Sequence, residues 1–366
     1  MPMGAFALTD TLEGHQGEVL CVATSDPAPG PELVASGSED STVRLWDLRT
    51  NKTVTCLCRC FDGEAVTSVA FGPRSSSNAF FAAAGQKIHE FDLRAGAGRL
   101  LLTDPVFTYC DNKDEINQVS LHTRSARFIA AADDTGSVKV YDLPSRSFRK
   151  ALKNAHKNIC STVQFNPARA WELASGGLDS TLAFWDFGTG RLRKKLDLSR
   201  DLPPCGGPGA ASGANASQVL NPPFCNSLSY TGDGRWLAAG LGDATVCVFD
   251  TGKGDLVGRC FGHLSPVSQV LYPPFAPDLL VSCGNDSRMM IWDQRRFRSD
   301  GINSLASSAA DIPCPSSSPH PALAAGGAPD AAEREAGGAP GGNSEGGGAR
   351  GGPAAQSTQR SAAAAS

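Results

Sequence analysis

The sequence predicts an all-β protein made of six repeated units, each of four short antiparallel strands. Trp-Asp pairs at residues 46–47, 185–186 and 292–293 each close a segment that a Gly-His or Ala-His pair opens. Weaker endings stand between them, so that the terminal Asp residues recur at intervals of 45, 50, 44, 64 and 43 residues. These weaker endings are Phe91-Asp92, Tyr141-Asp142 and Phe249-Asp250. A period of about 45 residues is typical of the blades of a β-propeller.

The first unit shows the pattern of one blade. Strands are expected at residues 18–23, 32–37, 42–47 and 52–60. The first strands of the next five units are expected at residues 65–71, 116–121, 159–165, 225–230 and 266–271, each leading into a strand of small residues. Isolated sheets of this size would expose apolar faces and unpaired edges, so we expect a closed ring of six or seven blades. Residues 6–12 are expected to supply the outer strand of the last blade.

Composition predicts the domain organisation. Of 366 residues, residues 1–298 carry the repeats and are expected to form one propeller. Residues 199–221 break the period with a Gly-rich and Ala-rich stretch, which is expected to be an inserted loop. Residues 299–366 are rich in Ala, Gly, Ser and Pro, and residues 301–366 hold no Phe, Trp or Tyr. This tail is expected to be disordered because it cannot bury enough apolar surface to offset backbone entropy.

Charge and cysteine content argue against several functions. The net charge is −4 and the 33 Lys and Arg residues are scattered, which is not typical of nucleic-acid binding. No apolar stretch is long enough to span a membrane, and the N-terminus lacks the basic region of a signal peptide, so we expect an intracellular protein of the cytoplasm, the nucleus or both. Cys56, Cys58 and Cys60 are expected on one face of a strand, which favours packing over metal binding.

Three units carry the same four residue types at matched spacing. In each, Ser precedes Asp by four residues and Asp precedes Trp by six. The three sets are His15, Ser36, Asp40 and Trp46; His156, Ser175, Asp179 and Trp185; and His263, Ser282, Asp286 and Trp292. A His-Ser-Asp set is also the composition of a hydrolase triad, but three copies that each include an indole donor favour a repeated structural network. We expect Asp to accept from the imidazole, and Ser to bond the imidazole and accept from the Trp N–H.

Other sequence motifs give no indication of catalysis or of a cofactor. The chain contains no GxxxxGK[ST] phosphate loop, and His89 and His122 lie in or beside predicted strands, where packed or surface histidines are common. We therefore expect a protein that is not an enzyme, needs no cofactor or metal, and binds other proteins through its faces.

The networks and the repeat period resemble those of the WD-repeat family over residues 5–298. The resemblance implies a WD40 β-propeller with six recognisable blades, or seven, followed by the tail. Three units depart from the family pattern, because they lack the usual His and replace Trp by Phe91, Tyr141 and Phe249. Two of them also replace Ser, by Ala131 and Ala239. These three blades are expected to depend more on apolar packing.

A second resemblance concerns the ends of three units. Asp-x-Arg follows the third strand at Asp47 and Arg49, at Asp92 and Arg94, and at Asp293 and Arg295. This is similar to the WDxR signature of substrate receptors of cullin-4 ubiquitin ligases, whose adaptor is the large damaged-DNA-binding subunit. The resemblance implies that these residues bind the adaptor and that the opposite face binds an unknown substrate protein. Asp-x-Arg also occurs in WD-repeat proteins that bind no ligase, where Arg pairs with a neighbouring acid, so a scaffold in another assembly is the alternative.

Overall fold

The computed structural model confirms an all-β propeller of six blades. It describes residues 10–25, 33–72, 78–94, 101–122, 125, 127–203, 221–295 and 312–313. All of them belong to the first of two compact units, residues 1–316, and the second unit, residues 317–366, lies outside the described residues. The division into a propeller at 1–298 and a disordered tail at 299–366 therefore stays a prediction.

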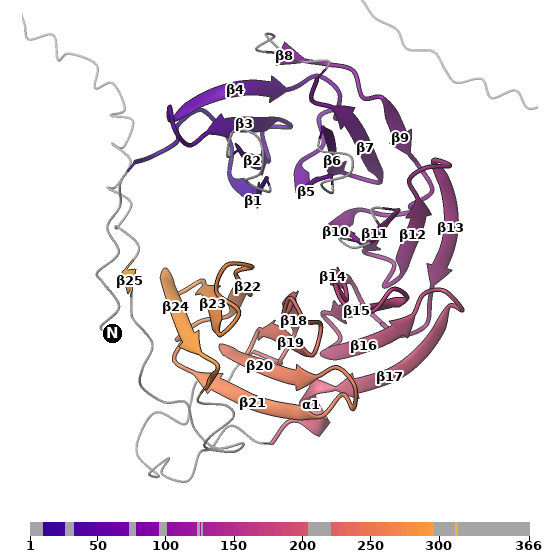
Figure 1. Ribbon diagram of the computed structural model, residues 1–366, viewed down its shortest axis with the longest axis vertical. Helices are drawn as coiled ribbons and strands as arrows, with labels where there is room; N and C mark the ends of the chain where they lie inside the picture. The colour runs from indigo at the N-terminus through magenta and orange to yellow at the C-terminus, as the bar shows by residue number, and fades with distance from the viewer. Residues whose placement is uncertain are drawn as a thin grey trace, which may run out of the picture. The chain divides into compact units, whose positions relative to one another are not determined.

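Six sheets follow one another in chain order around a ring, and we number them blades 1 to 6 (Figure 1). Blade 1 consists of β1 (Val19–Thr24), β2 (Leu33–Ser38), β3 (Val43–Asp47), β4 (Lys52–Leu57) and β8 (Leu101–Leu102). Blade 2 consists of β5 (Val66–Phe71), β6 (Ala79–Ala84), β7 (Lys87–Asp92) and β9 (Phe107–Tyr109). Blade 3 consists of β10 (Ile116–Leu121), β11 (Phe128–Asp133), β12 (Val138–Asp142) and β13 (Ser147–Leu152).

The second half of the ring repeats this order. Blade 4 consists of β14 (Cys160–Phe165), β15 (Glu172–Gly177), β16 (Thr181–Asp186) and β17 (Arg191–Asp197). Blade 5 consists of β18 (Cys225–Tyr230), β19 (Trp236–Leu241), β20 (Thr245–Asp250) and β21 (Leu256–Phe261). Blade 6 consists of β22 (Val267–Leu271), β23 (Leu279–Gly284), β24 (Arg288–Asp293) and β25 (Ile312–Pro313). The short helix α1 (Leu198–Asp201) follows blade 4.

The hydrophobic core is divided among the interfaces between neighbouring blades. In one cluster Ala174 and Leu182 of blade 4 pack with Cys225 and Leu228 of β18 in blade 5, and all four side chains are buried. Four further clusters join the other successive blades in the same way. The inner strands β1, β5, β10, β14, β18 and β22 line a central cavity of about 730 Å³. Each blade is therefore stabilised mainly by the packing of its two faces against the neighbouring blades.

Small residues in the second strands let the blades approach closely. A Cβ atom added at Gly37 would lie 2.7 Å from Cγ1 of Val66 in the next blade, and one added at Gly240 would lie 2.8 Å from Cγ1 of Val267. These distances are too short for any side chain, so the strands of small residues seen in the sequence are the surfaces on which the next inner strand rests.

Three local expectations differ from the structure. Residues 10–12 form no strand and residues 6–9 lie outside the described residues, while β25 pairs with β24 as its outer neighbour. Strand β4 ends at Leu57, so Cys58 and Cys60 follow the strand instead of extending it. The predicted loop at 199–221 begins inside α1, and residues 204–220 of it lie outside the described residues.

Candidate protein-interaction site

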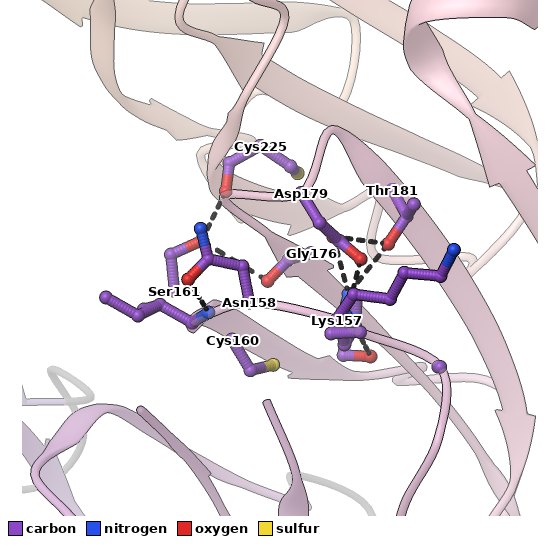
Figure 2. Close-up of polar contacts among 12 residues, drawn as sticks. Lys157, Asn158, Cys160, Ser161, Gly176, Asp179, Thr181 and Cys225 are labelled. Carbon is purple, nitrogen blue, oxygen red and sulfur yellow. Dashed lines mark hydrogen bonds and ion pairs between the residues drawn. The ribbon is translucent and has the colours of Figure 1, made fainter. Parts of the chain in front are cut away.

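The predicted four-residue set of blade 4 forms a chain of hydrogen bonds. Nδ1 of His156 lies 3.2 Å from Oδ1 of Asp179, and Nε2 lies 2.8 Å from Oγ of Ser175. Nε1 of Trp185 donates to the same Ser175 oxygen at 2.9 Å. Thr181 joins the chain, because its hydroxyl donates to Asp179 at 2.6 Å and lies 2.8 Å from Nδ1 of His156. Figure 2 shows Asp179 and Thr181 directed at each other, beside the backbone of Lys157.

Blades 1 and 6 repeat this geometry. In blade 1 the two His15 ring nitrogens lie 3.0 Å from Asp40 and 2.8 Å from Ser36, and Trp46 donates to Ser36 at 2.8 Å. In blade 6 the corresponding distances are 3.1 Å for His263 to Asp286, 2.8 Å for His263 to Ser282, and 2.8 Å for Trp292 to Ser282. A neutral imidazole fits this shared pattern when Nδ1 donates its proton to Asp and Nε2 accepts from the Ser hydroxyl.

The three serines are buried beneath their tryptophans. Ser36 is 6% exposed, and Ser175 and Ser282 are 0% exposed. Each hydroxyl oxygen accepts from an indole N–H, so it is not positioned to attack a substrate in solvent. The geometry supports a structural role for these sets and gives no support to a hydrolase triad.

The networks lower the pKa values of the turn aspartates. Burial alone would raise the pKa of Asp40, but hydrogen bonds from the Thr42 hydroxyl, the Gln16 amide and the His15 ring outweigh it and lower the pKa to about 2. For Asp179, too, burial is outweighed, and bonds from His156 and Thr181 lower its pKa. Both carboxylates are therefore held in the ionised form that accepts these bonds.

Replacing Asp179 by alanine should lower the free energy of unfolding by about 1–3 kcal/mol, because His156 and the Lys157 amide lose a part-buried acceptor. Urea denaturation followed by Trp fluorescence measures this loss. Asp255→Ala is the control, because the Asp255 side chain is 66% exposed and pairs with Lys194 across 3.4 Å. Equal stability of the two variants would contradict the role of the network.

Blades 3 and 5 contain buried ion pairs where the family pattern has its network. Nζ of Lys139 donates to Asp133 at 2.5 Å, and their side chains are 7% and 0% exposed. In blade 5, Arg259 of β21 pairs with Asp243, and their side chains are 5% and 3% exposed. The expectation that these two blades depend more on apolar packing is therefore incomplete. The isolated Lys139 between Val138 and Val140 is the sequence signal that could have revealed the first pair.

Blade 2 contains a buried histidine instead. His89 of β7 is 4% exposed and lies edge-on to Phe61, with ring centroids 5.3 Å apart. The Thr108 hydroxyl lies 3.3 Å from its Nδ1. Burial, with a smaller contribution from the charge of Lys87, lowers the pKa of His89 to about 4. The imidazole is therefore neutral in the folded protein near neutral pH.

The low pKa of His89 predicts acid-sensitive stability. Its ordinary pKa is 6.5, so as pH falls below that value the unfolded chain binds a proton that the folded protein does not. The unfolding free energy should be independent of this group above pH 6.5 and should decline by about 2–3 kcal/mol towards pH 4. Urea denaturation of wild type and His89→Phe between pH 7.5 and 4 isolates the effect. A constant difference between the two proteins across this range would contradict the prediction.

The three predicted arginines are exposed, and each pairs with the Asp two residues before it. Arg49 is 66% exposed and its Nη2 lies 3.1 Å from Asp47. Arg94 is 72% exposed at 2.7 Å from Asp92, and Arg295 is 69% exposed at 2.6 Å from Asp293. Each Asp also accepts from the backbone amide of its Arg, at 2.9, 2.9 and 3.0 Å. The carboxylates therefore hold both the turn and the guanidinium group of each arginine.

All three pairs lie on one face of the ring. Strands β3, β7 and β24 are the third strands of their blades, and they end at Asp47, Asp92 and Asp293. The turn that holds Asp40 lies at the opposite end of β3. We call the set of six residues, Asp47, Arg49, Asp92, Arg94, Asp293 and Arg295, the arginine face.

These features define a class. They are four-stranded blades arranged in a ring, with His-Ser-Asp-Trp networks in three of them, and they define a WD40 propeller. This class is generally non-catalytic and provides scaffolds for protein–protein interactions. The family described as WD domain, G-beta repeat matches residues 6–47, 147–186, 218–250 and 254–293. The unmatched stretch between 47 and 147 contains blade 2 and the first three strands of blade 3, and both of these blades lack the network.

Comparison with individual proteins agrees with this class. The chain is 31% identical over 296 residues to the WD repeat-containing protein 53 homolog of Dictyostelium discoideum, which covers 77% of each protein. It therefore belongs to the WD-repeat family. Segments such as EINQVSLH and HKNICSTVQFNP predict a resemblance to WD repeat-containing protein 53, and this is confirmed.

More distant relatives share part of the chain. The WD repeat-containing protein VIP3 of Arabidopsis thaliana is 26% identical over 164 residues, which are 44% of this chain and 48% of that protein. Striatin-4 of Mus musculus is 30% identical over 181 residues, which are 49% of this chain and 22% of that protein. In the part of the chain that the structure describes, no helix is long and apolar enough to cross a membrane.

Proposed function

We propose that this propeller is a substrate receptor that docks on the adaptor of a cullin-4 ubiquitin ligase through the arginine face. The observation that carries the proposal is the exposure of Arg49, Arg94 and Arg295, each about two-thirds or more, at equivalent places of one face. A guanidinium can bind a partner's carboxylate or carbonyl oxygens in bidentate fashion, which Lys cannot. The opposite face is left for the substrate protein.

The pairing of each Arg with its own Asp is compatible with this role. Exposed ion pairs contribute little to stability, so little free energy is lost if a partner replaces part of the pair. The bond from the Arg backbone amide to the same Asp keeps the turn in place while the guanidinium changes partner. Asp47, Asp92 and Asp293 would then act by positioning the arginines.

The same pairs favour a second candidate function. If Arg49 and Arg295 serve only their own aspartates, the propeller is a scaffold in an assembly without a ligase, and the arginine face has no partner. The two functions differ in what happens when the arginines are removed, because only the receptor loses its adaptor.

Binding of the full chain to the purified adaptor tests the proposal. We expect Arg49→Ala with Arg295→Ala to weaken binding at least thirtyfold, and Arg49→Lys with Arg295→Lys to weaken it nearly as much, because the bidentate fork is lost. Calorimetry or biolayer interferometry gives the dissociation constants. Arg127→Ala is the matched control: this residue is 55% exposed and pairs with Asp142, the terminal Asp of blade 3, at 2.7 Å. Absence of binding by the folded wild type would favour the scaffold.

A further inference from the structure

Neighbouring blades are joined by a repeated hydrogen bond near the centre of the ring. In four of the five interfaces, the second residue of an inner strand donates from its side chain to the backbone carbonyl of the first residue of the next inner strand, and between blades 1 and 2 the third residue, Cys21, donates to the Val66 carbonyl. The bonds are Thr67 to Ile116 at 2.5 Å, Asn117 to Cys160 at 3.1 Å, Ser161 to Cys225 at 2.5 Å, and Asn226 to Val267 at 3.0 Å. Figure 2 shows Ser161 directed at the Cys225 carbonyl of the next blade.

Three of the five interfaces contain a second bond, and all five contain an apolar contact. The third residue of the inner strand accepts from the backbone amide of the fourth residue of the next, as Ser68 does from Val119 at 3.1 Å, Gln118 from Val163 at 2.9 Å, and Ser227 from Val270 at 3.2 Å. The first and fourth side chains of β5, β10, β14, β18 and β22 are apolar and no more than 7% exposed. They rest against the preceding blade.

The two ends of this series are open. Val19 and Val22, the first and fourth residues of β1, are 51% and 55% exposed. Ser268 and Gln269 are the second and third residues of β22, the strand positions that bond the next blade in the other interfaces. Ser268 donates to the Cys283 carbonyl of its own blade, a bond that Ser161 also makes within its blade, to Gly176, beside its bond to the next blade. Figure 1 shows blades 1 and 6 standing apart. We call the surface formed by Val19, Val22, Ser268 and Gln269 the open edge.

We propose that the open edge binds a β-sheet from a partner protein, inserted between blades 1 and 6 as an additional blade. The five existing interfaces specify the inner strand of that sheet, because each uses the order apolar, polar, polar, apolar. Its first carbonyl would accept from Ser268 and its fourth amide would donate to Gln269, while its sheet face would cover Val19 and Val22. None of the four residues is charged, so the partner strand should be uncharged at these places.

Two features of the chain argue against a second copy and against residues 301–366 as the occupant. A second copy could enter the gap only by inserting its own blade 1. Because β5 packs directly against β1, blade 2 of that copy would then overlap with blade 1 of the first copy. Residues 301–366 of the chain lack Phe, Trp and Tyr, whereas each of the six blades contains one or more of these aromatic residues. Residues 301–366 therefore do not have the composition of a blade. The inference does not depend on the proposed ligase function, because the open edge includes no residue of the arginine face.

Site-specific photocross-linking in cells identifies the occupant. A benzophenone side chain is placed at position 22 of the full chain, and at position 54 as the control, since Val54 lies on the outer strand β4 and is 43% exposed. We expect position 22, and not position 54, to cross-link to another protein at a β-strand of the stated pattern. The captured protein is then purified, and hydrogen exchange of the wild-type chain is measured with and without it.

The expected result is protection of the β1 and β22 amides on binding. Val22→Asp should reduce the affinity at least tenfold, whereas Val54→Asp should leave it unchanged. Cross-links from position 22 to Val281 or Met289 of the same chain would show that blades 1 and 6 close directly and would overturn the proposal. Cross-links between isotopically distinct copies of the chain would also overturn it, as would the absence of any cross-link or exchange protection at the open edge.

Discussion

Replacing Asp243 by alanine is expected to lower the free energy of unfolding by about 3–5 kcal/mol, the range found when one partner of a buried ion pair is removed. Arg259 is 5% exposed and cannot reach water when its carboxylate is lost. Its Nε bond to Thr245 at 3.1 Å and its Nη1 bond to the Pro203 carbonyl at 2.8 Å would remain, but these acceptors are neutral. Urea denaturation measures the change.

A double variant separates the loss of the pair from the cost of a stranded charge. Arg259→Met in the Asp243→Ala background removes both charges, and we expect it to recover most of the lost stability, because a buried ion pair contributes little compared with apolar groups of similar volume. If the double variant is no more stable than Asp243→Ala, the loss is due to local packing, and the explanation by an uncompensated charge is wrong.

Replacing Lys139 by methionine should also destabilise the protein, by about 3–4 kcal/mol. Asp133 is 0% exposed and would lose its cationic partner. The loss should be smaller than for Asp243→Ala, because the Ser137 hydroxyl, which donates to Asp133 at 3.0 Å, and the Thr135 hydroxyl remain as donors. Thermal and urea unfolding both measure it.

Lys87→Met provides the matched control for this variant. Lys87 pairs with Asp62 at 2.7 Å, but the two side chains are 43% and 68% exposed, so its removal should change stability far less than the removal of Lys139. A loss of similar size in both lysine variants would mean that burial does not determine the contribution of these pairs.

The sequence predicted the repeats accurately because each blade has a local pattern that does not depend on its neighbours. Strands expected at 116–121 and 225–230 coincide with β10 and β18, and most other boundaries agree within a few residues. The matched spacing of His156, Ser175, Asp179 and Trp185 was likewise sufficient to predict which atoms meet. Ser175 and Trp185 lie on the consecutive strands β15 and β16, Asp179 lies in the turn between them, and His156 lies just before β14 of the same blade, so spacing determines proximity.

Features that depend on pairing between strands or blades were not predicted. Arg259 meets Asp243 only because β21 lies beside β20 in a register that places both side chains near the turn after β19. The position of the outer strand of blade 6 was predicted from residues 6–12, yet β25 takes this position in the structure. The exposure of Val19 and Val22 could not be predicted from the sequence either, because apolar residues at the equivalent strand positions are buried in every other blade.

The parallel strand β8 gives the first blade a mechanical link to the second. It lies between β7 and β9 of blade 2 in the chain, yet it pairs with β4 at the outer edge of blade 1, and Cys58 donates to the Leu102 carbonyl beside it at 3.2 Å. Terminal repeats normally fray before internal ones. Here blade 1 cannot separate without pulling the β7 to β9 connection out of place. The two blades should therefore open in a single step, and the smallest unit of unfolding at this end of the ring is a pair of blades.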